Sequence, residues 1–324
     1  MQILFYVTIL FYVVFLSNDC RAEKKVSEEP PQVRETAASL KSIFKRYRIF
    51  YDIDYLDKPE SKSQKLDLYV PKKAGKLEPV PVVIWIHGGG WSAGDKRFGP
   101  FVPLLKRDFA VASINYRLSQ EAKFPAQIHD CKRAVLWVKR NASRYNLDPA
   151  RVGVWGASAG GHLSALLGAT SSSDSLEKEK ESRELNSDVQ AVCDWFGPVN
   201  LSPVVKHDKG SKKYEVHRLV QELLGVDGRV LVEATRQASP VTYITPKAPP
   251  TLIMHGDRDK LVALKQSKEF YDKLKACNVD VQFETISGGH GFPGFGPLAR
   301  QKVVEFFSRV LSYPGKREDS FQSR

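Results

Sequence analysis

Cysteine is scarce in this sequence: only four occur among 324 residues, and no two of them form a CxxC pair. A small disulfide-scaffolded domain and a zinc ribbon both need closely spaced cysteines, so both are excluded. Cys131 and Cys193 fall within an expected helix and an expected strand, where we predict buried thiols, whereas Cys20 lies near the N-terminus. A single disulfide among Cys131, Cys193 and Cys277 stays an open alternative.

Several binding motifs are absent as well. The sequence has no HExxH or HxxEH pattern, and we expect no metal site. The glycines at 88–90 are not followed by Gly-Lys-Ser or Gly-Lys-Thr, so no phosphate-binding loop is predicted. The formal net charge is +12, but no compact Lys/Arg cluster is interleaved with aromatic residues, so we expect no nucleic-acid partner. The positive charge indicates either a solvated surface or attraction to an acidic polymer such as a uronic-acid-bearing polysaccharide.

The two ends of the chain differ from its middle. An apolar run at residues 3–16 is shorter than the about 20 residues that a helix needs to cross a bilayer, and Cys20 and Ala22 are small enough for a signal-peptidase site. We therefore predict a signal peptide at 1–22 and export to the periplasm or the medium, without stable membrane association after cleavage. No Lys or Arg precedes the run, so an uncleaved N-terminal membrane anchor is the alternative. Residues 23–45 are predicted to be a charged spacer, and 314–324 a polar tail.

Residues 46–313 show the pattern of one α/β domain. Alternating apolar and polar residues at 47–55 and 65–70 predict two antiparallel edge strands. Continuous apolar runs predict buried strands, and amphipathic stretches predict the helices between them. We expect these strands at 82–86, 109–115, 151–155, 189–195, 251–255 and 281–286, and helices at 125–142, 162–169, 263–276 and 297–311. The alternation predicts a doubly wound, mostly parallel sheet.

Residues 171–236 interrupt this alternation. The first part, 171–187, is rich in Ser, Glu and Lys and is expected to be a surface excursion. The later part, 203–236, carries apolar residues at helical spacing, namely Val216, Leu219, Val220, Leu223 and Leu224. The insertion could cover the active site as a small lid, or it could pack as ordinary helices.

Ser158 lies in the sequence Gly156-Ala157-Ser158-Ala159-Gly160, between an expected strand and an expected helix. In a Gly-x-Ser-x-Gly pattern at this place the serine occupies a strained strand-to-helix turn that exposes its hydroxyl. The flanking glycines remove side chains that would collide there. The pattern predicts Ser158 as the nucleophile of a serine hydrolase.

Ester hydrolysis by a serine also needs a base and a group that orients the base. Asp259 follows the expected strand 251–255 and could orient an imidazole, whereas Asp257 is expected to stabilise the turn. His290 lies in a glycine-rich loop after the strand 281–286. The chain order Ser, Asp, His is the one found on this kind of sheet. We predict that Ser158, Asp259 and His290 form a catalytic triad.

The loop after strand 82–86 has three consecutive glycines, whose bare N–H groups can converge on a developing negative charge. The predicted oxyanion hole has backbone donors from Gly88, Gly89 and Ala159. His87 is expected to form a hydrogen bond within this loop rather than act as a base. Asp130 is expected to stabilise the start of the helical segment 131–142. Candidates for lining the substrate pocket are Trp91 and Trp195.

In combination these motifs resemble the α/β-hydrolase superfamily. The segments concerned are HGGGW from His87, Asn115-Tyr116-Arg117, DPARVGVWGASAGGHL from Asp148, HGDRD from His255 and GGHGF from Gly288. They are most similar to hormone-sensitive-lipase-like esterases, especially the bacterial acetyl-esterase and xylan/feruloyl-esterase-like branch. The resemblance covers roughly residues 47–311. It implies the α/β-hydrolase fold, the triad and oxyanion donors named above, hydrolysis of carboxylic esters of small acids, and no cofactor.

Two departures from that family limit what the resemblance implies. Its larger lipase-like members have a long N-terminal helical cap, for which residues 23–47 are too short. Residues 171–236 are particular to this chain, so substrate choice transfers least.

The sequence therefore predicts an exported serine carboxylesterase. Its substrate would be a small ester or an acylated polysaccharide bearing acetyl or feruloyl groups. An amide hydrolase, such as an arylformamidase or a peptidase, is the first alternative, because the same triad cleaves amides. The second is a non-catalytic binding protein on this fold, although such proteins typically lose a triad member. No feature of the sequence indicates the oligomeric state.

Overall fold

The computed structural model describes residues 41–72, 78–171, 176, 186–202, 212–291 and 295–312. The chain divides into two compact units, Met1–Arg48 and Ile49–Arg324, and every predicted site residue lies in the second. The predicted signal peptide or anchor at 1–22, residues 23–40 of the spacer, and the polar tail at 314–324 lie outside the described residues. Among the described helices, none has both the length and the apolar character needed to cross a bilayer.

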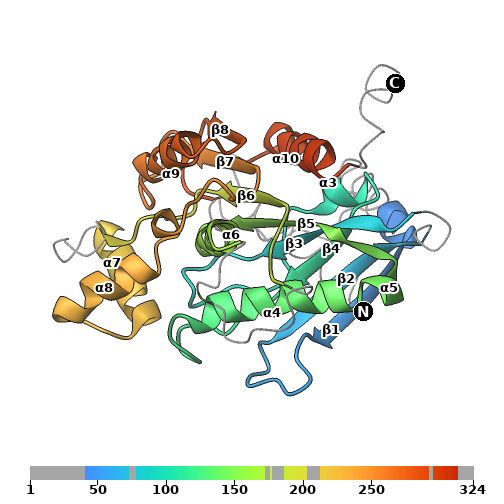
Figure 1. Cartoon of the computed structure of the whole chain (residues 1–324), viewed down its shortest axis with the longest axis horizontal. Coiled ribbons are helices and arrows are strands. Elements are labelled where there is room, and N and C mark those ends of the chain that lie inside the picture. The colour runs from blue at the N-terminus through green and yellow to red at the C-terminus, as the bar shows by residue number, and fades with distance from the viewer. Residues whose placement is uncertain are drawn as a thin grey trace, which may run out of the picture. The chain divides into compact units, whose positions relative to one another are not determined.

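The described residues form an eight-stranded sheet with the strand order β1-β2-β4-β3-β5-β6-β7-β8 (Figure 1). Strand β2 pairs antiparallel with β4, whereas β4-β3-β5-β6-β7-β8 are parallel throughout. This confirms the predicted mostly parallel sheet with an antiparallel N-terminal side. The bounds are β1 Tyr47–Asp54, β2 Lys65–Pro71, β3 Val80–Ile86, β4 Ala110–Ile114, β5 Leu147–Ala157, β6 Ala191–Trp195, β7 Thr251–Gly256 and β8 Val281–Ile286.

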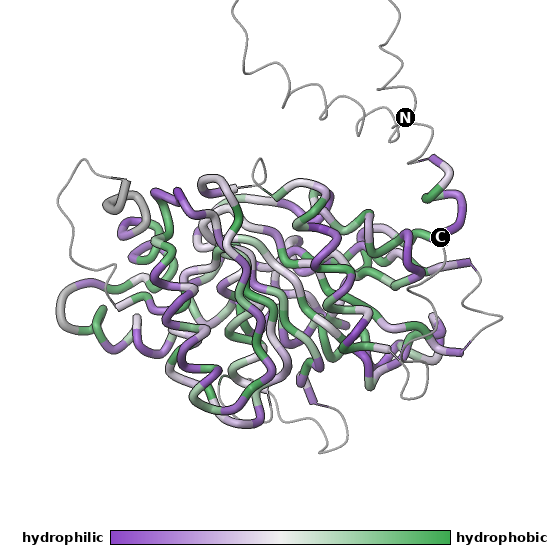
Figure 2. The backbone as a smooth tube through the Cα atoms, turned by 90° about the horizontal axis from the view of Figure 1, so that it is seen from above, coloured by the Kyte–Doolittle hydropathy of each residue, from purple (hydrophilic) through white to green (hydrophobic). Residues whose placement is uncertain are grey.

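Helices cover both faces of the sheet, as alternate residues of β5 show. Val152 and Val154 belong to a buried cluster shared with α4 (Ala126–Arg140) and α6 (Ala159–Ala169). Gly153, between them, faces the other side, where an added Cβ would lie 2.6 Å from Phe307 of α10 (Pro297–Val310). Helix α10 contacts α3 (Val102–Leu105), and α9 (Lys265–Ala276) shares a second cluster with α6. The sheet is therefore doubly wound. Figure 2 shows hydrophobic (green) and hydrophilic (purple) stretches alternating along the chain.

The inserted region contains two helices that pack against each other, α7 (Lys212–Leu224) and α8 (Gly228–Gln237) (Figure 1). The helical spacing at 216–224 predicted the first of them, and Val220 and Leu223 are fully buried. Helix α8 was not predicted. Most of the expected surface excursion at 171–187 lies outside the described residues.

The three cysteines within the described residues are free thiols, which closes the question of a disulfide among them. Cys131 and Cys193 are buried, as predicted, and Cys277 is half-buried. Burial raises the pKa of both buried thiols well above the usual value, so they stay protonated and inert.

Candidate active site

The predicted site residues follow the carboxyl ends of four parallel strands. Ser158 comes directly after β5, the glycine loop after β3, Asp259 after β7 and His290 after β8. Because parallel strands end at one edge of a sheet, the topology brings these segments together. Among the described residues, no group of three or more His, Cys, Asp or Glu side chains is arranged to hold a metal ion.

Ser158 occupies a sharp turn with φ +56° and ψ −119°. A positive φ at a residue other than glycine costs about 1–3 kcal/mol and persists only where the surroundings hold it. Here the Ser158 N–H donates to Trp195 O at 2.8 Å, and Ser158 O accepts the N–H of His162 at 2.9 Å as α6 begins. Gly160 must lack a side chain, because a Cβ there would lie 2.1 Å from Ile86 O. The strained turn therefore holds the serine hydroxyl at the edge of the sheet.

Three of the predicted side chains lie in one hydrogen-bonded chain. His290 Nε2 is 2.9 Å from Ser158 Oγ, and His290 Nδ1 is 2.7 Å from Asp259 Oδ2. A carboxylate only accepts, so Nδ1 carries the hydrogen and Nε2 is left free to accept the serine proton. The arrangement has the geometry that nucleophilic catalysis by a serine requires.

The Asp259 carboxylate is buried and saturated with donors. Its Oδ1 accepts the backbone N–H groups of Leu261 and Val262 at 2.8 and 2.9 Å. Burial alone would raise the pKa of Asp259, but hydrogen bonds from His255 and His290 and from the Val262 amide outweigh it and hold the pKa well below the usual value. Asp259 is therefore ionised at neutral pH. Asp257 stabilises the turn, as predicted, because its Oδ1 accepts the N–H of Gly288 at 2.8 Å.

His255 is a second histidine on the same carboxylate, and sequence reasoning gave it no role. Its Nε2 lies 2.9 Å from Val262 O and 3.2 Å from Asp259 Oδ2, and its Nδ1 lies 2.7 Å from Ser267 Oγ. The Val262 carbonyl only accepts, so Nε2 carries a hydrogen that also points toward Asp259. The side chain is fully buried and therefore helps to fix the carboxylate. The signal was its place four residues before Asp259, at the end of a buried strand.

The glycine loop lies against the serine turn. A Cβ on Gly88 would lie 2.7 Å from Ala157 O and 3.3 Å from Ser158 Cβ, so only glycine allows this approach. Within the described residues, no acceptor binds the backbone N–H groups of Gly88, Gly89 and Ala159. These amides are thus available to an oxyanion, and their role as its donors stays a prediction.

His87 holds this loop, as predicted. Its Nδ1 lies 2.8 Å from Gly88 O, and its ring stacks on Tyr116 with the centroids 4.5 Å apart. Burial lowers the pKa of His87, so the ring is neutral. Nδ1 carries the hydrogen, because the Gly88 carbonyl only accepts. The Tyr116 hydroxyl also donates to His87 O at 3.1 Å.

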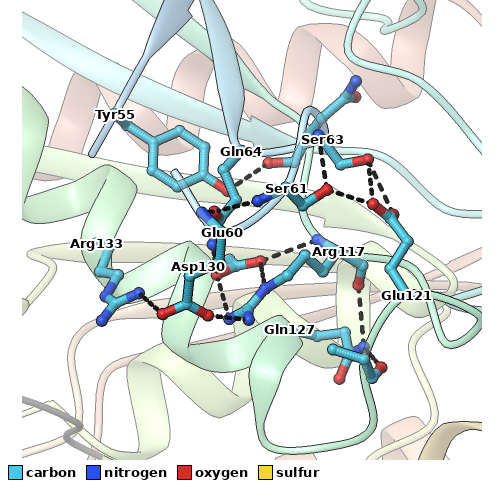
Figure 3. A network of polar contacts seen from close by, with 12 residues as sticks. Tyr55, Glu60, Ser61, Ser63, Gln64, Arg117, Glu121, Gln127, Asp130 and Arg133 are labelled. Carbon is cyan, nitrogen blue, oxygen red and sulfur yellow. Dashed lines mark hydrogen bonds and ion pairs between the residues drawn. The ribbon is translucent and has the colours of Figure 1, made fainter. Parts of the chain in front are cut away.

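A buried ion pair between Asp130 and Arg117 (Figure 3) fixes the segment that follows β4. Asp130 accepts the backbone N–H of Arg117 at 2.9 Å and its guanidinium at 2.8 Å through both Nε and Nη2. It also accepts Gln64 Nε2 at 2.7 Å. The expectation that Asp130 stabilises a helix start was wrong, because α4 begins at Ala126 and the carboxylate turns inward to Arg117. Because Arg117 directly follows Tyr116, the pair helps to fix the residue that contacts His87.

Phe196 contacts the imidazole of His290 edge-to-face, with the centroids 4.7 Å apart. Its φ of +45° is unusual for an aromatic residue. The turn is held by the Phe196 N–H, which donates to Met254 O at 2.8 Å, and by Asp194 Oδ1, which accepts the Gly197 N–H at 2.8 Å. Nothing in the sequence marked this position, since a glycine, not a phenylalanine, signals a positive φ.

The two tryptophans predicted to line the substrate pocket are both buried. Trp195 is packed between Trp155 and Phe295, with ring centroids 4.8 and 4.6 Å away. Trp91 is 2% exposed, and its indole N–H donates to His162 Nδ1 at 3.2 Å. The pocket role of each stays a prediction.

The buried imidazole of His162 predicts a pH-dependent stability. Burial lowers its pKa from 6.5 to about 4, so between these values the unfolded chain binds more protons than the folded protein. The contribution of this group to the free energy of unfolding is fully present above about pH 6.5. It falls by about 3 kcal/mol as the pH falls toward 4. Urea unfolding measures the free energy of unfolding of the wild type and of His162→Gln. The difference between the two proteins should be smaller at pH 4 than at pH 7.5 by that amount. Parallel pH curves for the two proteins would contradict it.

The family model for BD-FAE matches residues 66–274, which is more than half of the chain. The chain belongs to the BD-FAE family. This BD-FAE protein is similar to Esterase LipC of Mycobacterium tuberculosis, at 28% identity over 280 residues, 85% of this chain and 66% of LipC. It is also similar to isoprenylcysteine alpha-carbonyl methylesterase ICME of Arabidopsis thaliana, at 27% identity over 250 residues, 76% of this chain and 57% of ICME. It thus spans less than two thirds of these curated relatives.

A solved structure titled as a truncated form of a carbohydrate esterase from gut microbiota superimposes on this BD-FAE protein with a TM-score of 0.72. The two are 32% identical, and the alignment covers 83% of this chain and 98% of that one. The predicted α/β-hydrolase fold is confirmed.

Proposed function

We propose that this protein is a serine carboxylesterase that hydrolyses short-chain acyl esters through Ser158, His290 and Asp259. The observation that carries the proposal is the continuous chain of hydrogen bonds from Ser158 Oγ through His290 to Asp259, at 2.9 and 2.7 Å. It lies beside the Gly88 backbone, which closely approaches the serine. The esterases among its relatives support the same reading.

The geometry implies a two-step reaction. As Ser158 Oγ attacks the ester carbonyl, its proton passes to His290 Nε2, and the ionised Asp259 stabilises the imidazolium. The amides of Gly88, Gly89 and Ala159 hold the oxyanion, and the proton then moves from His290 to the leaving alcohol. A water that gives its proton to His290 next attacks the acyl-enzyme, and collapse of that adduct releases the acid and restores Ser158.

For the substrate we propose acetyl or feruloyl groups on a polysaccharide. Support comes from the carbohydrate esterase that is 32% identical over 83% of this chain. The formal net charge of +12 would also favour a polymer that carries uronic acids. Export after removal of residues 1–22 belongs to the same proposal, and a mature N-terminus at Glu23 would support it.

A substrate panel tests the proposed function. We expect turnover of p-nitrophenyl acetate, with kcat/KM falling by about tenfold or more toward the octanoate ester, and release of acetate from acetylated xylan or of ferulate from methyl ferulate. Preferred hydrolysis of formylkynurenine would indicate an amide hydrolase instead. No turnover of any ester, together with tight binding of a saccharide, would indicate a binding protein.

A further inference from the structure

The last residue of the glycine loop, Trp91, is anchored by its side chain to His162. Its backbone is left-handed, with φ +57°, and its buried indole N–H donates to His162 Nδ1 at 3.2 Å. The two rings are perpendicular, with the centroids 5.1 Å apart. His162 belongs to the first turn of α6, the helix that Ser158 begins. The imidazole therefore ties the end of the glycine loop to the helix of the proposed nucleophile.

The other nitrogen of His162 reaches the insertion. Nε2 lies 2.7 Å from the carbonyl oxygen of Ala238, the C-cap residue of α8. A carbonyl only accepts and an indole N–H only donates, so Nε2 carries the hydrogen and Nδ1 is bare. Both contacts thus require a neutral ring in one tautomer, and the low pKa of His162, about 4, keeps it neutral at working pH.

A second contact joins the insertion to the same loop. Leu219 of α7 lies on Gly90, where an added Cβ would be 2.8 Å from Leu219 Cδ1. Leu219 is half-buried. Helix α7 thus lies over the middle of the glycine loop, while α8 holds its end through His162.

A third connection runs through the segment after β4. Ser119 N–H donates to Trp91 O at 2.8 Å. Lys123 Nζ donates to Ser119 O at 2.9 Å and to Glu222 O, near the end of α7, at 2.8 Å. Three separate contacts therefore hold the glycine loop against the insertion.

We propose that the α7–α8 insertion is a brace for the oxyanion loop and that His162 is the positioning residue through which α8 holds it. This inference rests on the proposed function. An oxyanion hole works only when its amides are fixed before charge develops, because reorganisation during the reaction would raise the barrier. Residues 87–91 contain three glycines and so have little rigidity of their own. The brace supplies that rigidity from outside the loop.

Trp91→Phe tests the brace, because it removes the indole N–H and retains an aromatic ring. We expect kcat on p-nitrophenyl acetate to fall by about 10- to 100-fold with KM changed less than twofold. Displaced oxyanion donors stabilise the transition state less, whereas the binding of the substrate is little affected. The Ki of a trifluoromethyl ketone, which forms a tetrahedral adduct on the serine, should rise by a factor similar to the loss in kcat/KM. A purely structural role for Trp91 would lower Tm without these changes.

Trp85→Phe is the matched control. Trp85 is also buried, and its indole N–H donates to Phe98 O at 2.9 Å, away from His162. We expect Trp85→Phe to lower Tm and to keep kcat within twofold of the wild type. Three results would each overturn the proposed brace. They are equal losses of kcat in both variants, wild-type kcat in Trp91→Phe, and a Trp91→Phe variant in which only KM rises.

Leu219→Ala decides the matter if Trp91→Phe does not fold. We expect it to lower kcat by about 3- to 10-fold at constant KM, whereas Val230→Ala, at an exposed position of α8, should have no effect. Wild-type kcat in a folded Leu219→Ala would overturn the brace alone. A wild type that hydrolyses no ester would overturn the proposed function, and the brace with it.

Discussion

Ser158→Ala should lower kcat on p-nitrophenyl acetate by at least about a thousandfold. The substitution removes the proposed nucleophilic oxygen and leaves His290 and the predicted oxyanion donors in place. The residual rate would come from those groups acting on water. Steady-state kinetics, with circular dichroism to verify folding, measures the effect.

Ser164→Ala is the matched control, because Ser164 lies on α6, the helix that follows Ser158. Its Oγ is buried and finds no hydrogen-bond partner among the described residues, so alanine should be tolerated with kcat within about twofold of the wild type. Near-native turnover in Ser158→Ala would show that another group is the nucleophile.

Asp259→Asn should lower kcat at neutral pH by about 10²- to 10⁴-fold. The amide oxygen would take the place of Oδ1, which accepts two backbone N–H groups, so the NH₂ would face His290 Nδ1. A donor there forces the hydrogen of the imidazole onto Nε2, and this tautomer cannot accept the serine proton. The pH dependence of kcat, followed from pH 5 to 9, measures the loss across the range.

Asp257→Asn serves as the control for that variant. Asp257 is exposed and accepts one turn hydrogen bond from Gly288, so we expect a small loss of stability and kcat close to the wild type. If Asp257→Asn instead caused the larger loss, the orienting carboxylate would be the wrong one.

The sequence revealed the middle of the sheet because the strands there are buried on both faces. Val82, Val83 and Ile84 are apolar in succession since helices cover each side, and a short run of that kind is typical of a parallel strand. The order of Ser158, Asp259 and His290 likewise followed from local motifs at the ends of strands. Such signals are contained in a few adjacent residues.

The remaining features depend on contacts between distant segments, which one sequence does not contain. The positive φ of Phe196 is held by Met254 and Asp194, and neither contact leaves a turn signal. The contact of Asp130 with Arg117 joins residues 13 positions apart. The bridge from Trp91 through His162 to Ala238 joins residues 71 and 76 positions apart.

Covalent labelling with a fluorophosphonate, followed by peptide mass spectrometry, tests the central claim most directly. The account predicts one adduct per chain, on Ser158 Oγ, formed at a rate that falls at least about a hundredfold in Asp259→Asn because the attacking oxygen is activated through His290. An unmodified Ser158 in folded protein, or an adduct on a different serine, would contradict it.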